Sequence, residues 1–457
     1  MKKQLLALTI SLLTLSVSGQ ITFEKTYGGT DMDFGYSVRQ TTDNGYILLG
    51  STESFSTSRD IFLIKTDQYG DTLWTKTYGG SNFDEGHEVK QTMDGGYIIC
   101  GIKDLKTFII KTNNIGDTMW TKAYIGMGWS VEQIPDSGYI IAGGIWLGGA
   151  NYDMLLIKIN SSGDTLWTKT YGNNQAQECR DIKQTNDGGY ILTGYTVSGS
   201  TSDIYLVKTD SIGDTLWTRS FGGSGYEEAY SVEQTSDNGY IVLGNSNSFC
   251  GYKFYLIKTD VNGDTLWTKT YDNGNSNDEG YEVKQTSDGG YVFVAETDKN
   301  GLPYEQVYLV KTNGTGDTLW TQTYNQGSGV GLQITSDGGY IIIGFTGSFG
   351  AGMDDVYLIK TDANGNAMGI TESPNNFTCF HIFPNPFSST TTLHSDNFIR
   401  SATLTVYDSF RQTVKQIKNI TGQTINLHRE NLSSGLYFLQ LTQENKIIAT
   451  EKLVITD

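Results

Sequence analysis

Short apolar runs separated by polar turns recur along most of this chain. One kind of run follows a Gly-Tyr pair, as in GYIIC at 96–100, and another ends in lysine, as in DIFLIK at 60–65. Consecutive apolar residues over such short lengths are typical of strands that are covered on both faces. No segment carries an apolar period of 3.6 residues over a helical length, so the pattern predicts an all-β protein.

These runs belong to a repeat with a period of about 50 residues, which indicates a solenoid or a propeller. A third element, GDTLW or a close variant, is rich in threonine and aromatic residues that suit a pleated surface. Turns such as Asp-Gly-Gly separate the elements, so each unit consists of four short strands, as in the blade of a β-propeller. The elements recur at Tyr46, Tyr97, Tyr139, Tyr190, Tyr240, Tyr291 and Tyr340; at Lys65, Lys111, Lys158, Lys208, Lys258, Lys311 and Lys360; and at Trp74, Trp120, Trp167, Trp217, Trp267 and Trp320.

Seven copies of the tyrosine and lysine elements predict a seven-bladed β-propeller. The last unit lacks a tryptophan strand, whereas residues 22–29 (TFEKTYGG) match residues 73–80 (LWTKTYGG). We therefore expect the propeller to be closed by the N-terminal strand, which completes the last blade and removes two exposed sheet edges. The alternative is an open stack of sheets, which would not need complementary part-units at its two ends.

The chain is expected to have four segments. Residues 1–19 are predicted to be a secretory signal peptide, because Lys2 and Lys3 precede an apolar stretch at 5–15 and small residues at 17–19. No other segment is apolar enough to cross a bilayer, so we expect no transmembrane segment. The propeller is expected at 20–365, followed by a linker at 366–378 and a small immunoglobulin-like β-sandwich at 379–457.

The tail carries four landmarks in a fixed order. They are Pro384-Asn385-Pro386, the pair Tyr407-Asp408, the sequence Ser434-Gly435 followed by Tyr437, and a final apolar strand that begins at Lys452. In this order the tail resembles the type A C-terminal sorting domain of the type IX secretion system of Bacteroidetes bacteria. The resemblance covers residues 379–457.

The resemblance implies that the tail is an export signal, read by the type IX secretion machinery after the signal peptide has brought the chain to the periplasm. In that family the tail is usually removed at the outer membrane, and the cargo is released or attached to surface lipopolysaccharide. It therefore implies a protein that is secreted or displayed on the outer cell surface of a Gram-negative bacterium.

The charge of the chain narrows the choice of partners. The net charge is −18, and residues 379–457 contain seven Lys/Arg against six Asp/Glu, so the acidity lies in the repeat region. A propeller this acidic would repel phosphates, and we expect no nucleic acid partner. The charge favours a soluble protein outside the cell, and we expect a monomer.

The repeat region lacks a recognisable catalytic set. Its single histidine, His87, stands where other units have Tyr36 or Tyr281, so a histidine-based zinc site is not available. No Gly-x-Ser-x-Gly elbow stands between a strand and a helix. Only Arg59 and Arg180 depart from the repeat pattern, so an arginine triad at the channel mouth is not expected.

Aspartates recur in the turns before the tryptophan strands. We interpret them as hairpin formers whose carboxylates accept hydrogen bonds from nearby backbone N–H groups. They are Asp71, Asp117, Asp164, Asp214, Asp264 and Asp317.

The loops that differ between units indicate a ligand-binding face. If the tryptophan strand is outermost, the chain passes from it to the innermost strand of the next blade, and five of seven blades place carboxylates in that passage. The loops between the second and third strands emerge on the same face and carry aromatic residues. The predicted face comprises Asp33, Asp84, Glu85, Trp129, Trp146, Glu178, Tyr226, Glu227, Glu228, Asp278 and Glu279. The alternative is a solvated rim with scattered aromatic residues.

Carboxylates and amides are hard oxygen ligands that suit Ca²⁺. The densest such cluster is Asn273, Asn275, Asn277 and Glu279, and it is the one metal site that we consider; no other cofactor is expected. Aromatic rings beside acidic groups suit a polysaccharide or protein ligand. The sequence thus predicts a binding or adhesion module. The alternative is an extracellular glycan-active enzyme, a hydrolase or lyase, which would need paired carboxylates near the channel mouth.

Overall fold

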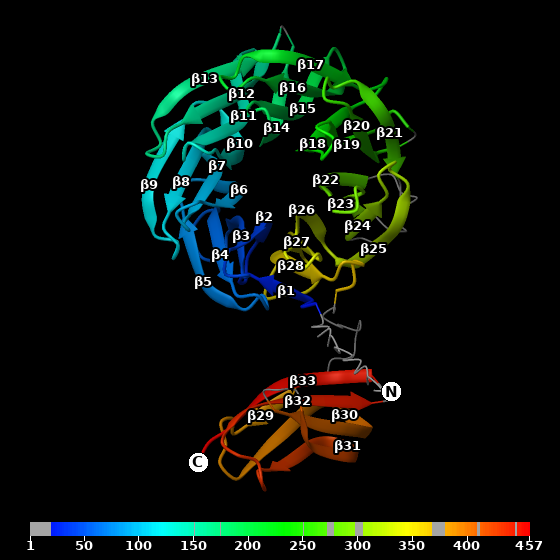
Figure 1. Ribbon diagram of the computed structural model, residues 1–457. Coiled ribbons are helices and arrows are strands. Elements are labelled where there is room, and N and C mark those ends of the chain that lie inside the picture. Colours follow the sequence, from blue (N-terminus) through cyan, green and yellow to red (C-terminus); the bar gives the residue numbers. More distant parts are fainter. Residues whose placement is uncertain are drawn as a thin grey trace, which may run out of the picture. The chain divides into compact units, whose positions relative to one another are not determined.

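The computed structural model describes residues 20–457 except 150, 174, 250, 272–277, 298–304, 368–379, 409–411 and 444–445. The predicted signal peptide and most of the predicted linker lie outside the described residues. The chain folds into two compact units, Met1–Gly369 and Ile370–Asp457 (Figure 1). Within the ranges just given, no helix has the length and apolar character needed to span a membrane.

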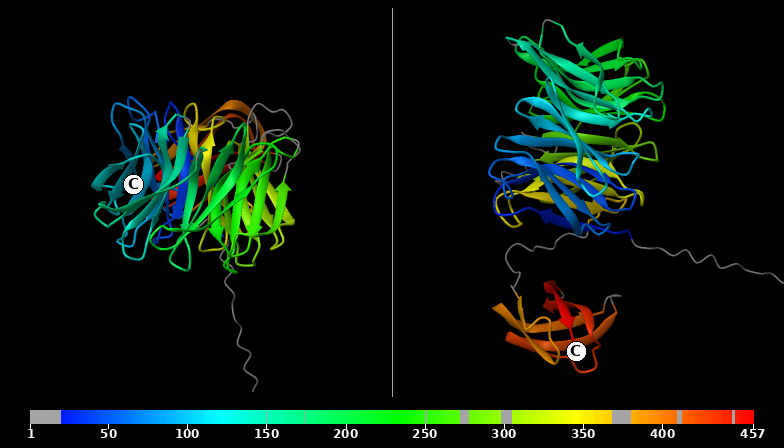
Figure 2. Two further views of the ribbon diagram at one scale, coloured as in Figure 1. Left: turned by 90° about the horizontal axis from the view of Figure 1, so that it is seen from above. Right: turned by 90° about the vertical axis from the view of Figure 1, so that its left-hand side faces the viewer.

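The first unit is a seven-bladed β-propeller, in which the described residues form seven four-stranded antiparallel sheets around one axis (Figure 1). Figure 2 shows the same ring from two further sides, with the hairpin turns of the blades along its two faces. The innermost strands are β2 (Asp33–Gln40), β6 (Asp84–Gln91), β10 (Met127–Gln133), β14 (Gln177–Gln184), β18 (Glu227–Gln234), β22 (Asp278–Gln285) and β26 (Ser328–Ile334). The second strands are β3 (Tyr46–Thr52), β7 (Tyr97–Lys103), β11 (Tyr139–Gly148), β15 (Tyr190–Ser198), β19 (Tyr240–Ser246), β23 (Tyr291–Thr297) and β27 (Tyr340–Thr346).

The outer half of each blade holds the lysine and tryptophan elements of the repeat. The third strands are β4 (Asp60–Thr66), β8 (Lys106–Thr112), β12 (Asn151–Ile159), β16 (Thr201–Thr209), β20 (Lys253–Thr259), β24 (Gln306–Thr312) and β28 (Asp355–Thr361). The outermost strands are β1 (Phe23–Tyr27), β5 (Thr72–Tyr78), β9 (Thr118–Tyr124), β13 (Thr165–Tyr171), β17 (Thr215–Phe221), β21 (Thr265–Tyr271) and β25 (Thr318–Gln326).

The second and third strands of the blades form the core. In β3 and β4, for example, every residue is buried. Neighbouring blades share their buried side chains: Tyr46 and Leu48 of β3 belong to one cluster with Ile341 and Ile343 of β27. Burial on both faces is what the consecutive apolar runs predicted, and it is confirmed.

A lysine fastens the first hairpin of each blade, and it is buried in six of the seven. Lys65 is 3% exposed, and its ammonium lies 2.9 Å from the carboxylate of Asp43 in the turn between β2 and β3. The same carboxylate accepts the hydroxyl of Thr41 and the N–H of Gly45. The pair recurs in every blade, as Lys65–Asp43, Lys111–Asp94, Lys158–Asp136, Lys208–Asp187, Lys258–Asp237, Lys311–Asp288 and Lys360–Asp337. One contact therefore accounts for both the repeated lysine and the repeated turn aspartate.

The aspartates before the tryptophan strands link neighbouring blades. Asp117 pairs at 2.9 Å with Lys76 of the preceding blade, and Tyr78 of that blade donates its hydroxyl to the carbonyl of Gly116. The N–H groups of the turn are instead bound by Asn113, which begins it. Our interpretation of Asp71, Asp117, Asp164, Asp214, Asp264 and Asp317 was therefore wrong. The Asp or Asn four residues earlier closes the turn, as Asx residues do, and leaves the later carboxylate free to reach the next blade.

The N-terminal strand completes the last blade, as predicted. β1 pairs antiparallel with β28, from Phe23 opposite Lys360 to Tyr27 opposite Val356. Phe23 takes the place of the repeated tryptophan: its ring lies 6.1 Å from that of Tyr46 in an edge-to-face contact. The closing strand therefore makes the same kind of aromatic contact with the next blade as the tryptophan strands of the other blades make.

The second unit is an all-β domain with a core of its own. Its strands β29 (Phe380–Phe383), β30 (Thr390–Tyr407), β31 (Thr413–His428), β32 (Gly435–Gln443) and β33 (Lys446–Ile455) form one antiparallel sheet of five strands. The long β30 changes register several times, and it pairs β29 near its start and β32 near its end. Buried residues such as Leu393, Leu404 and Leu453 fill the interior.

The sequence landmarks of the tail hold this domain together. Asn385 accepts the N–H of Val454 at 2.8 Å, and the carbonyl of Pro384 accepts the hydroxyl of Thr391. Asp408 closes the turn after β30 by accepting the N–H of Gln412. Tyr407 donates its hydroxyl to the side chain of Gln440, and Tyr437 donates its hydroxyl to the carbonyl of Ser433. Gly435 is the first residue of β32. Lys452 lies in β33 opposite Phe438 of β32.

Candidate functional site

A β-bulge in every innermost strand lines the channel with one extra residue. The register with the second strand shifts at the same place in each blade, for example between Gly35 and Ser37 of β2. Such a bulge leaves one residue unpaired and redirects its side chain. The extra residues are Tyr36, His87, Trp129, Arg180, Tyr230, Tyr281 and Val330. All seven line a pocket of about 330 Å³, which we call the axial pocket.

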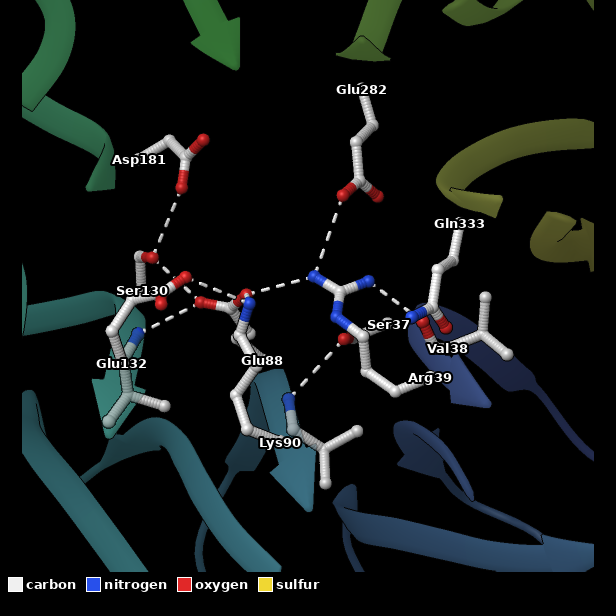
Figure 3. Close-up of polar contacts among 12 residues, drawn as sticks. Ser37, Val38, Arg39, Glu88, Lys90, Ser130, Glu132, Asp181, Glu282 and Gln333 are labelled. Carbon is white, nitrogen blue, oxygen red and sulfur yellow. Dashed lines mark hydrogen bonds and ion pairs between the residues drawn. The ribbon is translucent and has the colours of Figure 1, made fainter. Parts of the chain in front are cut away.

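Ion pairs between blades line the part of the axial pocket that lies further along the innermost strands than the bulges, which we call its deeper layer. Arg39 of β2 lies 3.0 Å from Glu88 and 3.5 Å from Glu282, which come from β6 and β22 (Figure 3). The same network includes Lys90, which pairs with Glu88, and Lys183, which pairs with Asp181. Burial alone would raise the pKa of Glu88, but Lys90, Lys183 and Arg39 hold it well below its usual value. The cations of this layer are thus already paired within the protein.

The same acidic side chains also bind the backbone of the next blade. Glu88 accepts the N–H of Val131, Asp181 that of Val232, and Glu282 that of Leu332. Each bond crosses from one blade to its neighbour. This layer therefore fixes the positions of the inner strands and supports the side chains above it.

Arg180 and Trp129 form the centre of one wall of the axial pocket. The guanidinium carbon of Arg180 lies 4.6 Å from the centre of the Trp129 ring, and 5.8 Å from the rings of Tyr195 and Tyr230. Such stacking suits the flat guanidinium. Glu178 holds one end of the group at 3.3 Å, but the Nε atom is buried without a hydrogen-bond partner in the described structure.

His87 extends this wall on the neighbouring blade. Its ring lies 4.3 Å from that of Trp129, and its side chain is only 10% exposed. Burial, together with the positive charge of Arg180, lowers the pKa of His87 to about 3, so the ring is neutral at physiological pH. His87 Nε2 and Trp129 Nε1 are, like Arg180 Nε, buried without a partner among the described residues.

Four of the predicted glutamates lie near the start of the innermost strands, in or next to the lining of the axial pocket. Each accepts a tyrosine hydroxyl: Glu85 from Tyr36 at 2.8 Å, Glu178 from Tyr195 at 2.6 Å, Glu228 from Tyr230 at 3.2 Å and Glu279 from Tyr281 at 2.9 Å. Burial raises the pKa of Glu228. Of the predicted face, Glu85 and Trp129 therefore line the axial pocket. Glu178, Glu228 and Glu279 lie behind its lining, where they contact Arg180, Tyr230 and Tyr281. Trp129 lies at the bulge of β10 and not in a rim loop, where we expected it.

Three other predicted carboxylates lie between blades and do not reach the pocket. Asp33, Asp84 and Glu227 are 0% exposed. Asp33 accepts the N–H of Gly29, and Glu227 accepts that of Gly223 and the hydroxyls of Ser246 and Ser248. Asp84 pairs with Lys103. We predicted these three as part of the ligand-binding face, but their side chains are enclosed and hold the segments around the passage from one blade to the next.

The remaining predicted residues are dispersed. Trp146 is 60% exposed in the β11–β12 hairpin, and Tyr226 is 49% exposed before β18. Asp278 begins β22, while Asn273, Asn275 and Asn277 lie outside the described residues. Over the described part of the chain, no group of three or more His, Cys, Asp or Glu side chains is arranged to hold a metal ion.

Sequence reasoning missed most of the pocket. It set aside His87 and Arg180 as departures from the repeat, it named Tyr36 and Tyr281 only as the counterparts of His87, and it did not name Tyr230. The signal was present in the repeat alignment: one position of the innermost strand follows a small residue and varies from blade to blade, while the apolar positions around it stay alike. Variation at one position of a uniform repeat marks the side chains that face the axis.

Comparisons with known proteins identify the family of the tail. Residues 381–456 match the family described as the secretion system C-terminal sorting domain. The tail is a type IX sorting domain. The chain is therefore a β-propeller that is exported to the outer surface or beyond it in a Gram-negative bacterium, and its sorting domain implies contact with the secretion machinery. A search of curated proteins found no match.

Solved structures with a similar fold cover the propeller. A catalytically inactive virginiamycin B lyase from Staphylococcus aureus, with Quinupristin, is 11% identical, covers 74% of this chain and 99% of that chain, and has a TM-score of 0.48. Sqt1 of Chaetomium thermophilum, bound to the N-terminus of a ribosomal protein, is 8% identical over 74% and 98%, with a TM-score of 0.46. Drosophila Plexin A with Semaphorin 1b is 9% identical over 74% and 86%, with a TM-score of 0.46. At these identities the matches carry no information on ligand or activity.

Proposed function

We propose that this protein is a secreted or surface-attached binding and adhesion module whose ligand enters the axial pocket. The observation that carries the proposal is the wall of His87, Trp129 and Arg180, where three buried polar atoms lack a partner in the described structure. Buried polar groups are almost always hydrogen-bonded, and an orphan of this kind is often satisfied by a ligand or water. Aromatic rings with a few converging polar groups are typical of binding pockets.

A binding experiment tests this function. The chain from residue 20 to 457 would be screened on glycan and peptide arrays, and hits would be measured by titration calorimetry. We expect Trp129→Ala to weaken binding at least tenfold, the loss typical of a buried aromatic anchor. The matched control is Trp146→Ala, because Trp146 is exposed and lies outside the pocket lining. Binding that survives Trp129→Ala and disappears with Trp146→Ala would refute the assignment.

A second candidate function is an extracellular glycan-active enzyme. The observation that favours it is Glu296, whose pKa is raised to about 7 by burial and by the nearby Glu305, a value suited to a general acid. Its strand places it opposite Glu279. The array hits would therefore be incubated with the protein and assayed for new reducing ends or unsaturated products. Turnover that is lost in Glu296→Gln would favour the enzyme over the binding module.

A further inference from the structure

Three unpaired polar atoms of the axial pocket belong to side chains on adjacent blades. His87, Trp129 and Arg180 occupy the same bulge position in β6, β10 and β14, and their side chains touch in series. Arg180 Nε and Trp129 Nε1 are donors in every protonation state, and His87 Nε2 donates in one tautomer. A ligand that satisfies this wall must therefore present several acceptor atoms close together.

The positive charge of Arg180 favours an anionic acceptor, and it must do so beside two carboxylates of the protein, Glu178 at 3.3 Å from Arg180 and Glu85 at 3.9 Å from His87. Arg180 is held at one end by Glu178, whereas its Nε edge remains unpaired. The cations of the deeper layer cannot serve a ligand, because Arg39, Lys90, Lys183 and Lys284 are already paired with carboxylates. A carboxylate has two coplanar oxygens, and arginine binds such a group through parallel N–H donors.

The residues that flank the wall present acceptors: Tyr36 lies beside His87, Tyr230 beside Arg180, and Tyr281 follows Tyr230 on the next blade. Tyr36, Tyr230 and Tyr281 donate their hydroxyl hydrogens to Glu85, Glu228 and Glu279. The tyrosine oxygens and the remaining carboxylate lone pairs can accept further hydrogen bonds. A ligand with several hydroxyl groups satisfies them, whereas the end of a peptide offers few donors beyond its own N–H groups. A sugar also stacks on aromatic rings through its apolar face.

The size of the pocket limits the bound part of the ligand to one sugar unit. Its volume of about 330 Å³ is at the low end of the roughly 300–1,000 Å³ common for ligand pockets. The ion pairs of Arg39 with Glu88 and Glu282 lie in its deeper layer (Figure 3). A chain end therefore fits this pocket better than the middle of a polymer.

We infer that the axial pocket binds a terminal uronic acid unit of an acidic polysaccharide, with the sugar carboxylate against His87, Trp129 and Arg180 and the sugar hydroxyls toward the tyrosine–glutamate pairs. This inference rests on the proposed binding function of the same pocket. It adds the chemical class of the ligand.

Titration calorimetry with matched ligands tests the inference on the chain from residue 20 to 457. The probes are oligosaccharides that end in glucuronic or galacturonic acid, and the same oligosaccharides ending in glucose or galactose. We expect the uronate-terminated ligands to bind about 10- to 100-fold more tightly, the range for hydrogen bonds to a charged group. Equal affinity for both sets would overturn the inference and leave the binding function intact.

Two variants separate the carboxylate contact from the fold. Arg180→Gln should reduce the affinity for the uronate-terminated ligand to that of its neutral counterpart, while the neutral ligand binds as before. Arg219→Gln removes the same charge on an outer strand, where Arg219 pairs with Asp264, and should change neither affinity. Unaltered uronate binding in Arg180→Gln, with a melting curve like that of the wild type, would refute the contact.

A further variant and a second class of ligand test the donor atoms and the saccharide assignment. Trp129→Phe keeps an aromatic ring but removes the Nε1 donor and part of the stacking surface, so it should lower the affinity for the uronate-terminated ligand more than that for the neutral ligand. A ligand carboxylate could also come from the C-terminus of a peptide, so peptides with a free C-terminal carboxylate are compared with their C-terminal amides. Binding of the free peptides without binding of uronates would overturn the saccharide assignment. Failure of every ligand to bind would contradict both this inference and the proposed function.

Discussion

Lys25 and Asp71 form an ion pair between the strand that closes the propeller and the first blade, 46 residues further along the chain. The same pair joins ordinary neighbours elsewhere in the ring, as between Lys76 and Asp117 at 2.9 Å. Tyr27 completes the match by donating its hydroxyl to Gly70 at 2.6 Å. The closing strand therefore uses the inter-blade contacts of the repeat, and ring closure depends on a segment at the start of the chain.

Deletion of residues 20–30 should destabilise the propeller strongly. The deletion removes β1, exposes β28 as an edge and uncovers the first blade, and exposed edges promote aggregation. Phe23→Ala is the milder test, because Phe23 is 8% exposed, and it should cost about 3–5 kcal/mol. Leu73→Ala, at a residue 58% exposed on β5, serves as control and should cost far less. Thermal melts and light scattering measure both effects, and a truncated protein that melts like the full one would refute this account of closure.

The sequence predicted the ring because its signals are local and repeated. A run such as GYIIC fills both faces of a strand wherever it occurs, and the truncated copy at 22–29 could be aligned by eye with 73–80. These patterns depend on burial alone, so seven copies reinforce one another. The number of blades and the closing strand could be predicted for the same reason.

The pocket could not be predicted in the same way, because it depends on which face each residue takes. Neighbours in a strand point to opposite sides, so Glu227 is buried between blades while Glu228 bonds Tyr230 of the axial pocket. The bulge then changes the side for Arg180 and its counterparts, and one residue of register decides the face. Composition of the loop showed that carboxylates were present. It did not show that Asp33 would be enclosed by its own loop.

The propeller should fold without the sorting domain. The buried clusters of the blades contain only residues between 23 and 359, and that of the tail only residues from 387 onward. Each unit thus has the core of an independent domain. A chain of residues 20–365 should melt within a few degrees of the full protein.

The sorting domain should be removed from the protein at the cell surface of the native host. Intact mass spectrometry of the surface form should give the mass of a chain without the tail, and a surface form that retains Val454 and Ile455 would contradict processing.

Asp288→Asn should destabilise the propeller at neutral pH. Burial opposes the ionisation of Asp288, but hydrogen bonds from Thr286 and Lys311 outweigh it and lower its pKa to about 2. A lowered pKa contributes stability above the unfolded pKa of about 3.9, and that stability is lost as the pH falls toward 2. The variant removes the negative charge beside the buried Lys311 and one of the two oxygens that its ammonium contacts, so we expect a loss of about 1–3 kcal/mol at pH 7. Denaturant melts at pH 7 and pH 3 should show the loss shrinking in acid.

Asp355→Asn should have the opposite effect, because two carboxylates meet where the last blade joins the first. Asp33 and Asp355 are both buried, and each has an Oδ1 atom with no partner among the described residues. Both lie against Gly28, where a Cβ atom would come within 2.1 Å of Asp355 and 2.5 Å of Asp33, so only glycine fits between them. Burial raises the pKa of Asp355, and the charges of Asp33 and Asp354 add to the rise.

A raised pKa contributes stability that is complete below the unfolded value and is lost as the pH rises through the folded one. The wild type therefore carries an ionisation cost at this junction at neutral pH. Asparagine keeps an oxygen for the N–H groups of Ala351 and Gly352, removes the charge and supplies a donor toward Asp33. We expect Asp355→Asn to stabilise the protein by about 1 kcal/mol at pH 7, the net worth of one hydrogen bond, and by less near pH 4. Melts of this variant beside Asp288→Asn at both pH values provide the measurement. A loss of stability at pH 7 in Asp355→Asn would refute this account of the junction.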